Sequence, residues 1–153
     1  MIVAMLIVHA LLAVTLIGAL THQALSVWWP VSAGERSFFG NFRAVRAAAY
    51  TKGIIVIYVA TAAMGGLIYP NFRTGARIAL EELRAKVPLG AFDLKEHYIA
   101  IGLGMLPTYW YYWRQPLSPE LARARAMFTA ILALAVWWSF IIGHVLNNLR
   151  GLE

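Results

Sequence analysis

The chain alternates between long apolar segments and short connections that hold most of its polar residues. Four apolar segments cover about residues 2–29, 53–69, 97–113 and 126–149. Each approaches or exceeds the roughly 20 residues with which an α-helix crosses a hydrocarbon core about 30 Å thick. Transmembrane strands would instead alternate in polarity over segments of about ten residues, and the sequence has no such pattern. We therefore predict an all-α fold, an up-down bundle of four transmembrane helices that forms one domain over residues 1–153.

Composition supports a location in the lipid bilayer. Hydrophobic residues make up 61% of the chain and charged residues 13%, whereas a soluble domain is about half apolar and about a quarter charged. Trp28, Trp29 and Tyr69 stand at the ends of predicted helices, where such rings favour the headgroup layer. The first segment lacks a basic start and is longer than the roughly 7–15 apolar residues of a signal peptide, so we expect it to remain as a helix.

The longest connection, between the second and third apolar segments, has a pattern of its own. Between residues 77 and 87, apolar residues stand at positions 79, 80, 83 and 87, and charged residues fill most of the rest. This spacing gives one apolar stripe along a helix. It predicts a short amphipathic helix over about residues 75–87, which either lies on the membrane surface or forms a docking surface for a partner.

An even number of crossings places both termini on one side of the membrane, which we name face A; the opposite side is face B. Face B has seven Lys and Arg residues, and face A has six. Orientation follows the number of Lys and Arg residues, which is higher on the cytoplasmic side. The N-terminal segment has no basic side chain. Both observations favour a cytoplasmic face B and a periplasmic face A.

Four histidines lie within or at the edges of the apolar segments: His9, His22, His97 and His144. An ionisable side chain at membrane depth is costly, which makes each of them a candidate functional residue. The chain has no cysteine, so histidine is its only strong nitrogen or sulfur ligand for a metal. With a rise of about 1.5 Å per residue, three of these histidines reach the level of face A, and only His22 lies toward face B.

The helical positions of the histidines favour one haem b over two. His9 and His22 are thirteen residues apart, which leaves them roughly 140° apart around a straight helix, so one face of that helix does not present both to stacked haems. The first and third transmembrane helices of an up-down bundle lie diagonally, and the fourth contacts both. We therefore expect a haem between His9 and His97, with His144 as a competing ligand or a hydrogen-bond partner of a propionate.

Small and basic residues near face A fit a haem in the same place. Alanines and glycines border the histidines and would admit a flat macrocycle, although close helix packing also favours such residues. Arg73, Arg77 or Arg150 would hold the haem propionates by charge-assisted hydrogen bonds.

A metal ion bound directly by protein ligands is the alternative site. His9, His97 and His144, with Glu96 as a fourth ligand, would bind copper or another transition metal, because imidazole suits copper, zinc and iron. The sequence has no Gly-rich phosphate loop, nucleophile elbow or dinucleotide fingerprint. Its basic residues are divided between two membrane faces, which favours contact with anionic headgroups or an acidic partner over nucleic acid.

The first helix resembles that of a known group of proteins. The segment 7–18, its Trp28-Trp29 end and Lys95 ahead of the third helix are similar to small four-helix bacterial membrane proteins, namely the copper-resistance D-like group and the HemJ-type protoporphyrinogen oxidases. In the HemJ-type proteins the histidine of this helix is implicated in haem binding. The resemblance implies a multi-pass protein of the bacterial inner (cytoplasmic) membrane in which His9 is a haem ligand.

These observations lead to three functional hypotheses. The first is a membrane-embedded b-type haem protein that transfers single electrons between a quinol and a redox partner, as a subunit of a larger oxidoreductase or as a homo-oligomer. The second is a histidine-based membrane protein that handles copper or another metal ion. The third is a non-catalytic accessory subunit of a respiratory or photosynthetic membrane complex.

Overall fold

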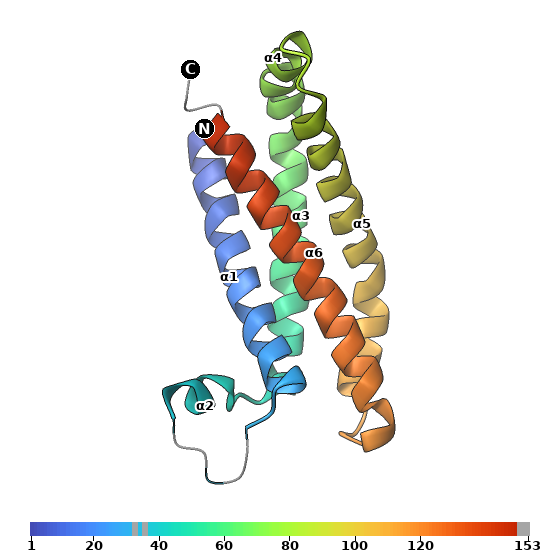
Figure 1. The fold of residues 1–153 in the computed structure, drawn as a ribbon. Helices are drawn as coiled ribbons and strands as arrows, with labels where there is room; N and C mark the ends of the chain where they lie inside the picture. Colours follow the sequence, from blue (N-terminus) through green and yellow to red (C-terminus); the bar gives the residue numbers. More distant parts are fainter. Residues whose placement is uncertain (32–33, 35–36, 150–153) are drawn as a thin grey trace.

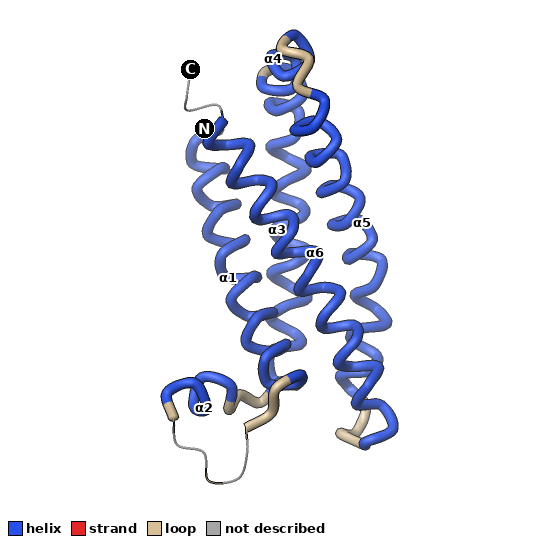
Figure 2. Tube along the Cα trace, in the orientation of Figure 1, coloured by secondary structure: helices blue, strands red, loops and turns tan. Residues whose placement is uncertain are grey.

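The computed structural model describes residues 1–31, 34 and 37–149. Every regular element within these residues is a helix, and no strand occurs among them (Figure 2). The prediction of an all-α fold is confirmed. The elements are α1 (Ile2–Trp28), α2 (Phe38–Arg43), α3 (Ala47–Thr74), α4 (Ala76–Glu82), α5 (Lys86–Arg114), the short 3-10 helix η1 (Pro119–Leu121) and α6 (Ala122–Leu149).

Four long helices, α1, α3, α5 and α6, lie side by side (Figure 1). Helix α1 contacts α3 and α6, and α5 contacts the same two helices. Consequently α1 and α5 lie diagonally across the molecule, as the up-down order of the helices predicts. The start of α1 and the last turns of α6 lie at the same end as α4, which is face A, and α2 lies at the other end, face B (Figure 1).

Of the helices that the structure describes, three are long and apolar enough to cross a membrane. These are α1, α3 and the stretch Pro119–Leu146, most of which belongs to α6. Helix α5 has a similar length, but its first three turns contain four charged residues and its last two turns consist mainly of tyrosine and tryptophan. These residues lower its mean hydropathy. Three of the four predicted membrane-spanning helices are thus long and apolar enough to cross a membrane.

Helices α3 and α5 extend beyond the apolar segments that predicted them. Helix α3 begins at Ala47 rather than near residue 53 and continues through Pro70 to Thr74. Helix α5 begins at Lys86 rather than near residue 97. Hydropathy detects only the part of a helix that lipid would surround, whereas backbone hydrogen bonds continue into the polar sequence at either end. The apolar pattern therefore underestimates both helices.

The expected surface helix over residues 75–87 is shorter in the structure. Helix α4 covers only Ala76–Glu82. Arg84 then has a φ of 54°, a left-handed conformation that an α-helix does not accommodate, and the chain turns directly into α5. The end of α3 and the start of α5 are packed together by the rings of Phe72 and Phe92, whose centroids are 3.9 Å apart.

The sequence pattern does not predict α2, a helix of six residues at face B. The Ser37 hydroxyl accepts a hydrogen bond from the Gly40 N–H (2.9 Å) and caps the first turn. Arg43 is buried and donates hydrogen bonds to the carbonyl oxygens of Trp29 (3.0 Å) and Phe39 (3.3 Å), which holds α2 against the end of α1. So short a helix contains too few turns to show a periodic pattern.

The packed core fills the middle and the face-B half of the molecule. Its buried side chains include Leu16, Leu20, Ile54, Tyr58, Leu106, Tyr109, Leu132 and Val136. Within this core the Tyr109 hydroxyl donates to Gln23 Oε1 (2.6 Å), and Gln23 Nε2 donates to the carbonyl oxygen of Ala47 (2.9 Å). Because Gln23 is fully buried, these hydrogen bonds satisfy an amide that would otherwise be costly to bury. They also connect α5, α1 and α3.

Candidate functional site

A cavity of about 590 Å³ lies between α1, α3, α5 and α6 in the face-A half of the molecule. This volume is within the range of about 300–1,000 Å³ that is typical of cofactor and ligand sites. Most of the lining is apolar, and much of it consists of small residues: Ala10, Ala13, Ala62, Gly65, Gly66, Ala100 and Gly143. Ala10, Ala13, Ala100 and Gly143 stand close to a histidine in the sequence, and Ala62, Gly65 and Gly66 come from α3. They leave room between the helices where larger side chains would fill it.

His9 lines this cavity from α1. Its ring lies against α3, because Cε1 is 3.3 Å from the position that a Cβ atom on Gly65 would occupy. Its Nδ1 atom is buried and makes no hydrogen bond within the described residues; the main chain of Thr61 lies near the ring but outside hydrogen-bonding geometry. A buried ring nitrogen without a partner is unusual in a native protein and points to a bound group that supplies one.

His144 lines the same cavity from α6, which is a neighbour of α1. Its ring is nearly parallel to that of Phe140, with centroids 6.3 Å apart and an interplanar angle of 5°. The structure thus brings His9 and His144 to one cavity from two adjacent helices.

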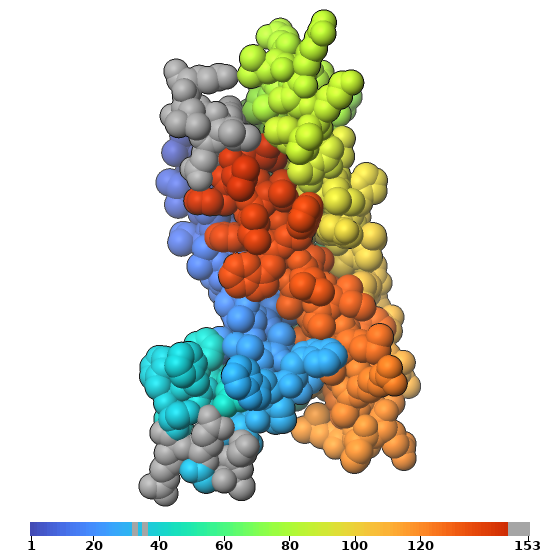
Figure 3. All heavy atoms as spheres, in the orientation of Figure 1, coloured from blue at the N-terminus to red at the C-terminus, as the bar shows by residue number. Residues whose placement is uncertain are grey.

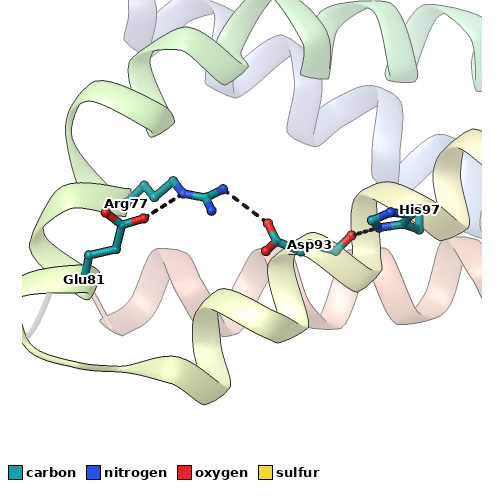
Figure 4. Close-up of polar contacts among 4 residues, drawn as sticks. All are labelled: Arg77, Glu81, Asp93 and His97. Carbon is teal, nitrogen blue, oxygen red and sulfur yellow. Dashed lines mark hydrogen bonds and ion pairs between the residues drawn. The ribbon is translucent and has the colours of Figure 1, made fainter.

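His97 does not belong to this cavity, although the sequence analysis places it opposite His9. The side chain is exposed, and its Nδ1 donates a hydrogen bond to the carbonyl oxygen of Asp93 at 2.6 Å (Figure 4). Consecutive residues on a helix differ by about 100° in direction. Because Glu96 faces the cavity, its neighbour His97 is turned away from it. The diagonal pair of His9 and His97 is therefore not assembled.

Lys95 and Glu96 are the two charged residues in the cavity wall. The Lys95 ammonium lies 4.6 Å from the centroid of the Phe92 ring, a cation–π contact. It is also close enough to His9 for its charge to act on that ring. From the sequence alone, Lys95 is identified only through a resemblance to other proteins. Helical spacing contains a signal for Lys95, because positions 95, 96, 99, 100 and 103 form one face of a helix. All five residues line the cavity.

The arginines expected to hold haem propionates are placed elsewhere. Arg77 of α4 forms ion pairs with Glu81 (3.0 Å) and with Asp93 (3.2 Å) (Figure 4). The hydrogen bond to Glu81, with the charge of Asp93, raises the pKa of the Arg77 guanidinium. Arg73 is exposed near the end of α3 and does not line the cavity, and Arg150 lies outside the described residues. Lys95 is the cationic side chain that reaches the cavity wall.

The hydroxyl groups in the cavity wall are used within the protein. Tyr58 donates to the carbonyl oxygen of Ile99 (3.2 Å). Thr61 and Ser139 donate to carbonyl oxygens one turn earlier in their own helices, at 2.7 Å each. The other polar groups in the cavity wall are the two imidazoles, the Lys95 ammonium and the Glu96 carboxyl.

The described residues do not provide a ligand set for a directly bound metal ion. Among the residues that the structure describes, no group of three or more His, Cys, Asp or Glu side chains is close enough together to hold an ion. The fourth histidine, His22, lies at face B with its ring against Phe42, at a centroid distance of 3.9 Å. The expected separation of His22 from the face-A histidines is present.

No protein-family model, curated protein or solved structure matches this chain.

Proposed function

We propose that this chain is a membrane-embedded b-type haem protein with one haem in the face-A cavity. The observation that favours this function most is the buried, unpartnered Nδ1 of His9, which lies in a cavity that His144 also lines. In this proposal α5 crosses the membrane as a fourth helix beside the three that are apolar enough to do so. The likeness of the first helix to HemJ-type and copper-resistance D-like proteins agrees with a haem ligand at His9.

The donor set and the shape of the cavity fit a haem. Imidazole is a common axial ligand of haem iron, and His9 and His144 are the two imidazoles in the cavity wall. Gly65 leaves space against the His9 ring that a Cβ atom would narrow. The remaining wall is mostly apolar and includes seven alanines and glycines, which suits the faces of a porphyrin.

Lys95 supplies the positive charge that a haem carboxylate requires. A charge-assisted hydrogen bond between an ammonium and a carboxylate is stronger than one between neutral groups. Lys95 lines the cavity, whereas Arg77 is engaged by Glu81 and Asp93. We therefore assign the propionate contact to Lys95 in place of Arg73 and Arg77. Glu96, next to it, provides a carboxyl group that can accept or release a proton at the cavity wall.

The proposed role is one-electron transfer between a quinol and a redox partner in the bacterial inner membrane, with face A toward the periplasm. When bound, the haem would supply the electron-accepting iron. The protein would bind it through His9 and His144, balance its carboxylate through Lys95 and exclude water with the apolar wall. The chain would act as a subunit of a larger redox complex or as a homo-oligomer.

An optical spectrum of the purified protein tests this proposal. We expect a Soret band in the oxidised protein and a sharp α-band after reduction. His9→Ala should lose most of the bound haem, because it removes the ligand with the unpartnered nitrogen. His22→Ala is the matched control and should retain the haem, since His22 lies at the other end of α1. The absence of a Soret band in the unaltered protein, or equal loss in both variants, would contradict the proposal.

A further inference from the structure

Arginine and tryptophan side chains pair at three places on the face-B end of the molecule. The distances from guanidinium carbon to ring centroid are 4.3 Å for Arg43 and Trp29, 4.7 Å for Arg114 and Trp110, and 6.0 Å for Arg125 and Trp113. The pairs come from three different parts of the chain: the α1–α2 region, the end of α5 and the start of α6. We name these three pairs, together with α2 and the exposed Arg46, Lys52 and Arg123, the face-B belt.

Helix α2 presents large apolar side chains to the outside. Phe38 is 79% exposed, Phe39 is 73% exposed, and the neighbouring Trp29 is 65% exposed. This helix projects from the side of the bundle at face B (cyan in Figure 3). Its position is fixed by the buried Arg43, which donates hydrogen bonds to the carbonyl oxygens of Trp29, after α1, and Phe39, within α2. A rigidly held patch of exposed aromatic rings indicates contact with another apolar phase or molecule.

Most of the charged side chains around this patch are positive. Arg46, Lys52, Arg114 and Arg123 are exposed at face B, and Glu120 is the one acidic residue at this end within the described part of the chain. Face A differs, because its basic Arg77 is paired with acidic partners. The face-B belt therefore combines apolar rings with four exposed basic side chains, whereas its Arg43 and Arg125 are buried and bond to carbonyl oxygens within the protein.

We infer that the face-B belt binds the headgroups of anionic phospholipids, with α2 lying in the headgroup layer and its two exposed phenylalanines directed toward the acyl chains. Tryptophan and phenylalanine are suited to this depth, and basic side chains close to a membrane end attract anionic lipids. The same contact would place face B at the leaflet with the greater negative charge. The inference rests on the chain crossing a membrane and not on the haem, so it can fail or succeed independently of the proposed function.

Lipid binding by matched charge variants is the first test. The full chain is purified in a zwitterionic detergent and titrated with phosphatidylglycerol or phosphatidylcholine, and retained lipid is measured by native mass spectrometry. Arg46→Gln with Lys52→Gln removes two exposed charges from face B. Arg84→Asn with Lys86→Gln removes two exposed charges from face A, and Asn tolerates the left-handed backbone at residue 84.

We expect the unaltered chain to prefer phosphatidylglycerol and the face-B variant to bind it roughly tenfold more weakly. The face-A variant should bind it like the unaltered chain. Equal weakening in the two variants, or no preference for phosphatidylglycerol in the unaltered chain, would overturn the inference. Circular dichroism establishes that each variant keeps its helix content.

The depth of α2 gives a second, independent measurement. The chain has no cysteine, so Phe39→Cys takes a single spin label, and Glu82→Cys in α4 serves as a control at face A. In vesicles that contain phosphatidylglycerol, the label at residue 39 should be more accessible to dissolved oxygen than to a water-soluble nickel chelate. Preferential access by the nickel chelate would show that α2 stands in water, and low access by both reagents would show that it faces a protein partner. Either result would exclude the proposed contact.

Discussion

The two halves of this helical molecule are built in opposite ways. In the face-B half the helices are packed around fully buried side chains such as Leu20, Tyr109 and Gln23. In the face-A half the same four helices leave a partly open cavity of about 590 Å³, whose mostly apolar wall includes several alanines and glycines. Since close packing is the ordinary state of a protein interior, the open half needs an explanation that the packed half does not. A bound group is the explanation we propose.

The two halves also differ in how far their buried polar side chains are hydrogen-bonded. At the face-B end, Gln23 bonds to Tyr109, and the Trp113 indole N–H donates to the Thr129 hydroxyl (3.2 Å). Thr51 is the exception there, with a buried hydroxyl that makes no hydrogen bond in the described part of the chain. At the face-A end, His9 lines the cavity with a buried Nδ1 atom that has no hydrogen-bond partner among the described residues. Polar groups in the first half connect helices, whereas the second half holds this one buried ring nitrogen, Nδ1 of His9, left without a hydrogen bond by the residues that the structure describes.

The largest effect on stability is expected where the packed core meets the cavity. A Cβ atom at Gly102 would overlap the hydroxyl of Tyr58 and stand 2.7 Å from its Cζ, and Tyr58 is held by a hydrogen bond to Ile99. Gly102→Ala should therefore lower the free energy of unfolding by about 2 kcal/mol. Gly104→Ala is the control, because a Cβ atom there meets nothing within 4 Å. Unfolding in a mixed-detergent titration measures both variants, and equal stability of the two would contradict this account of the core.

A smaller loss of stability is expected when hydrogen bonds in the face-B half are removed. Gln23→Leu removes the acceptor of the Tyr109 hydroxyl and the donor to the Ala47 carbonyl. We expect a loss of about 1 kcal/mol in the same unfolding measurement. Haem content should be unchanged, because Gln23 does not line the cavity. Lost haem without lost stability would show that the two halves are not independent.

Haem affinity should respond to a single methyl group at the cavity wall. At Gly65 an added Cβ atom would stand 3.3 Å from Cε1 of His9, whereas at Gly66 it would meet nothing within 4 Å. Gly65→Ala should weaken haem binding severalfold by displacing the imidazole, and Gly66→Ala should leave it unaltered. Titration of the haem-free protein with haemin gives both affinities. Equal affinities would indicate that the His9 ring does not bind the iron in this orientation.

The smallest effect is expected from the ion pairs over the face-A end. Arg77 is partly exposed and pairs with Glu81 and Asp93, which are more exposed still. Solvent and salt screen such pairs strongly. Arg77→Gln should leave both the midpoint of unfolding and the haem content unchanged within error, at low and at high salt. Loss of haem in this variant would indicate that Arg77 holds a haem propionate, as the sequence predicts.

The apolar pattern predicts some parts of this molecule well. The bounds of α1 and α6 follow their apolar segments closely, because nearly the whole of each helix is apolar. The level of His9 and His144 follows from the helical rise alone, and the cavity lies at that level. The small residues around it are visible in the sequence, although only the structure distinguishes the tight contact at Gly102 from the open position at Gly104.

Other features depend on information that apolar spacing does not contain. The direction of His97 is determined by the rotation of α5 about its axis, which places Lys95 and Glu96 toward the cavity instead. Helix α2 is held by the contacts of Arg43 with distant backbone and by one cap. Helical spacing therefore predicts the level of the cavity and identifies His9 and His144, which line it, but it does not predict that His97 is turned away or that Lys95 reaches the wall.

The most direct measurement of the proposed site is electron paramagnetic resonance of the oxidised protein in three forms. We predict a low-spin ferric signal, typical of two imidazole ligands, in the unaltered chain and in His97→Ala. His144→Ala should convert this signal to high spin, because one axial ligand is lost while His9 still holds the haem. A low-spin signal that survives in His144→Ala but disappears in His97→Ala would contradict the pairing of His9 with His144 across the face-A cavity.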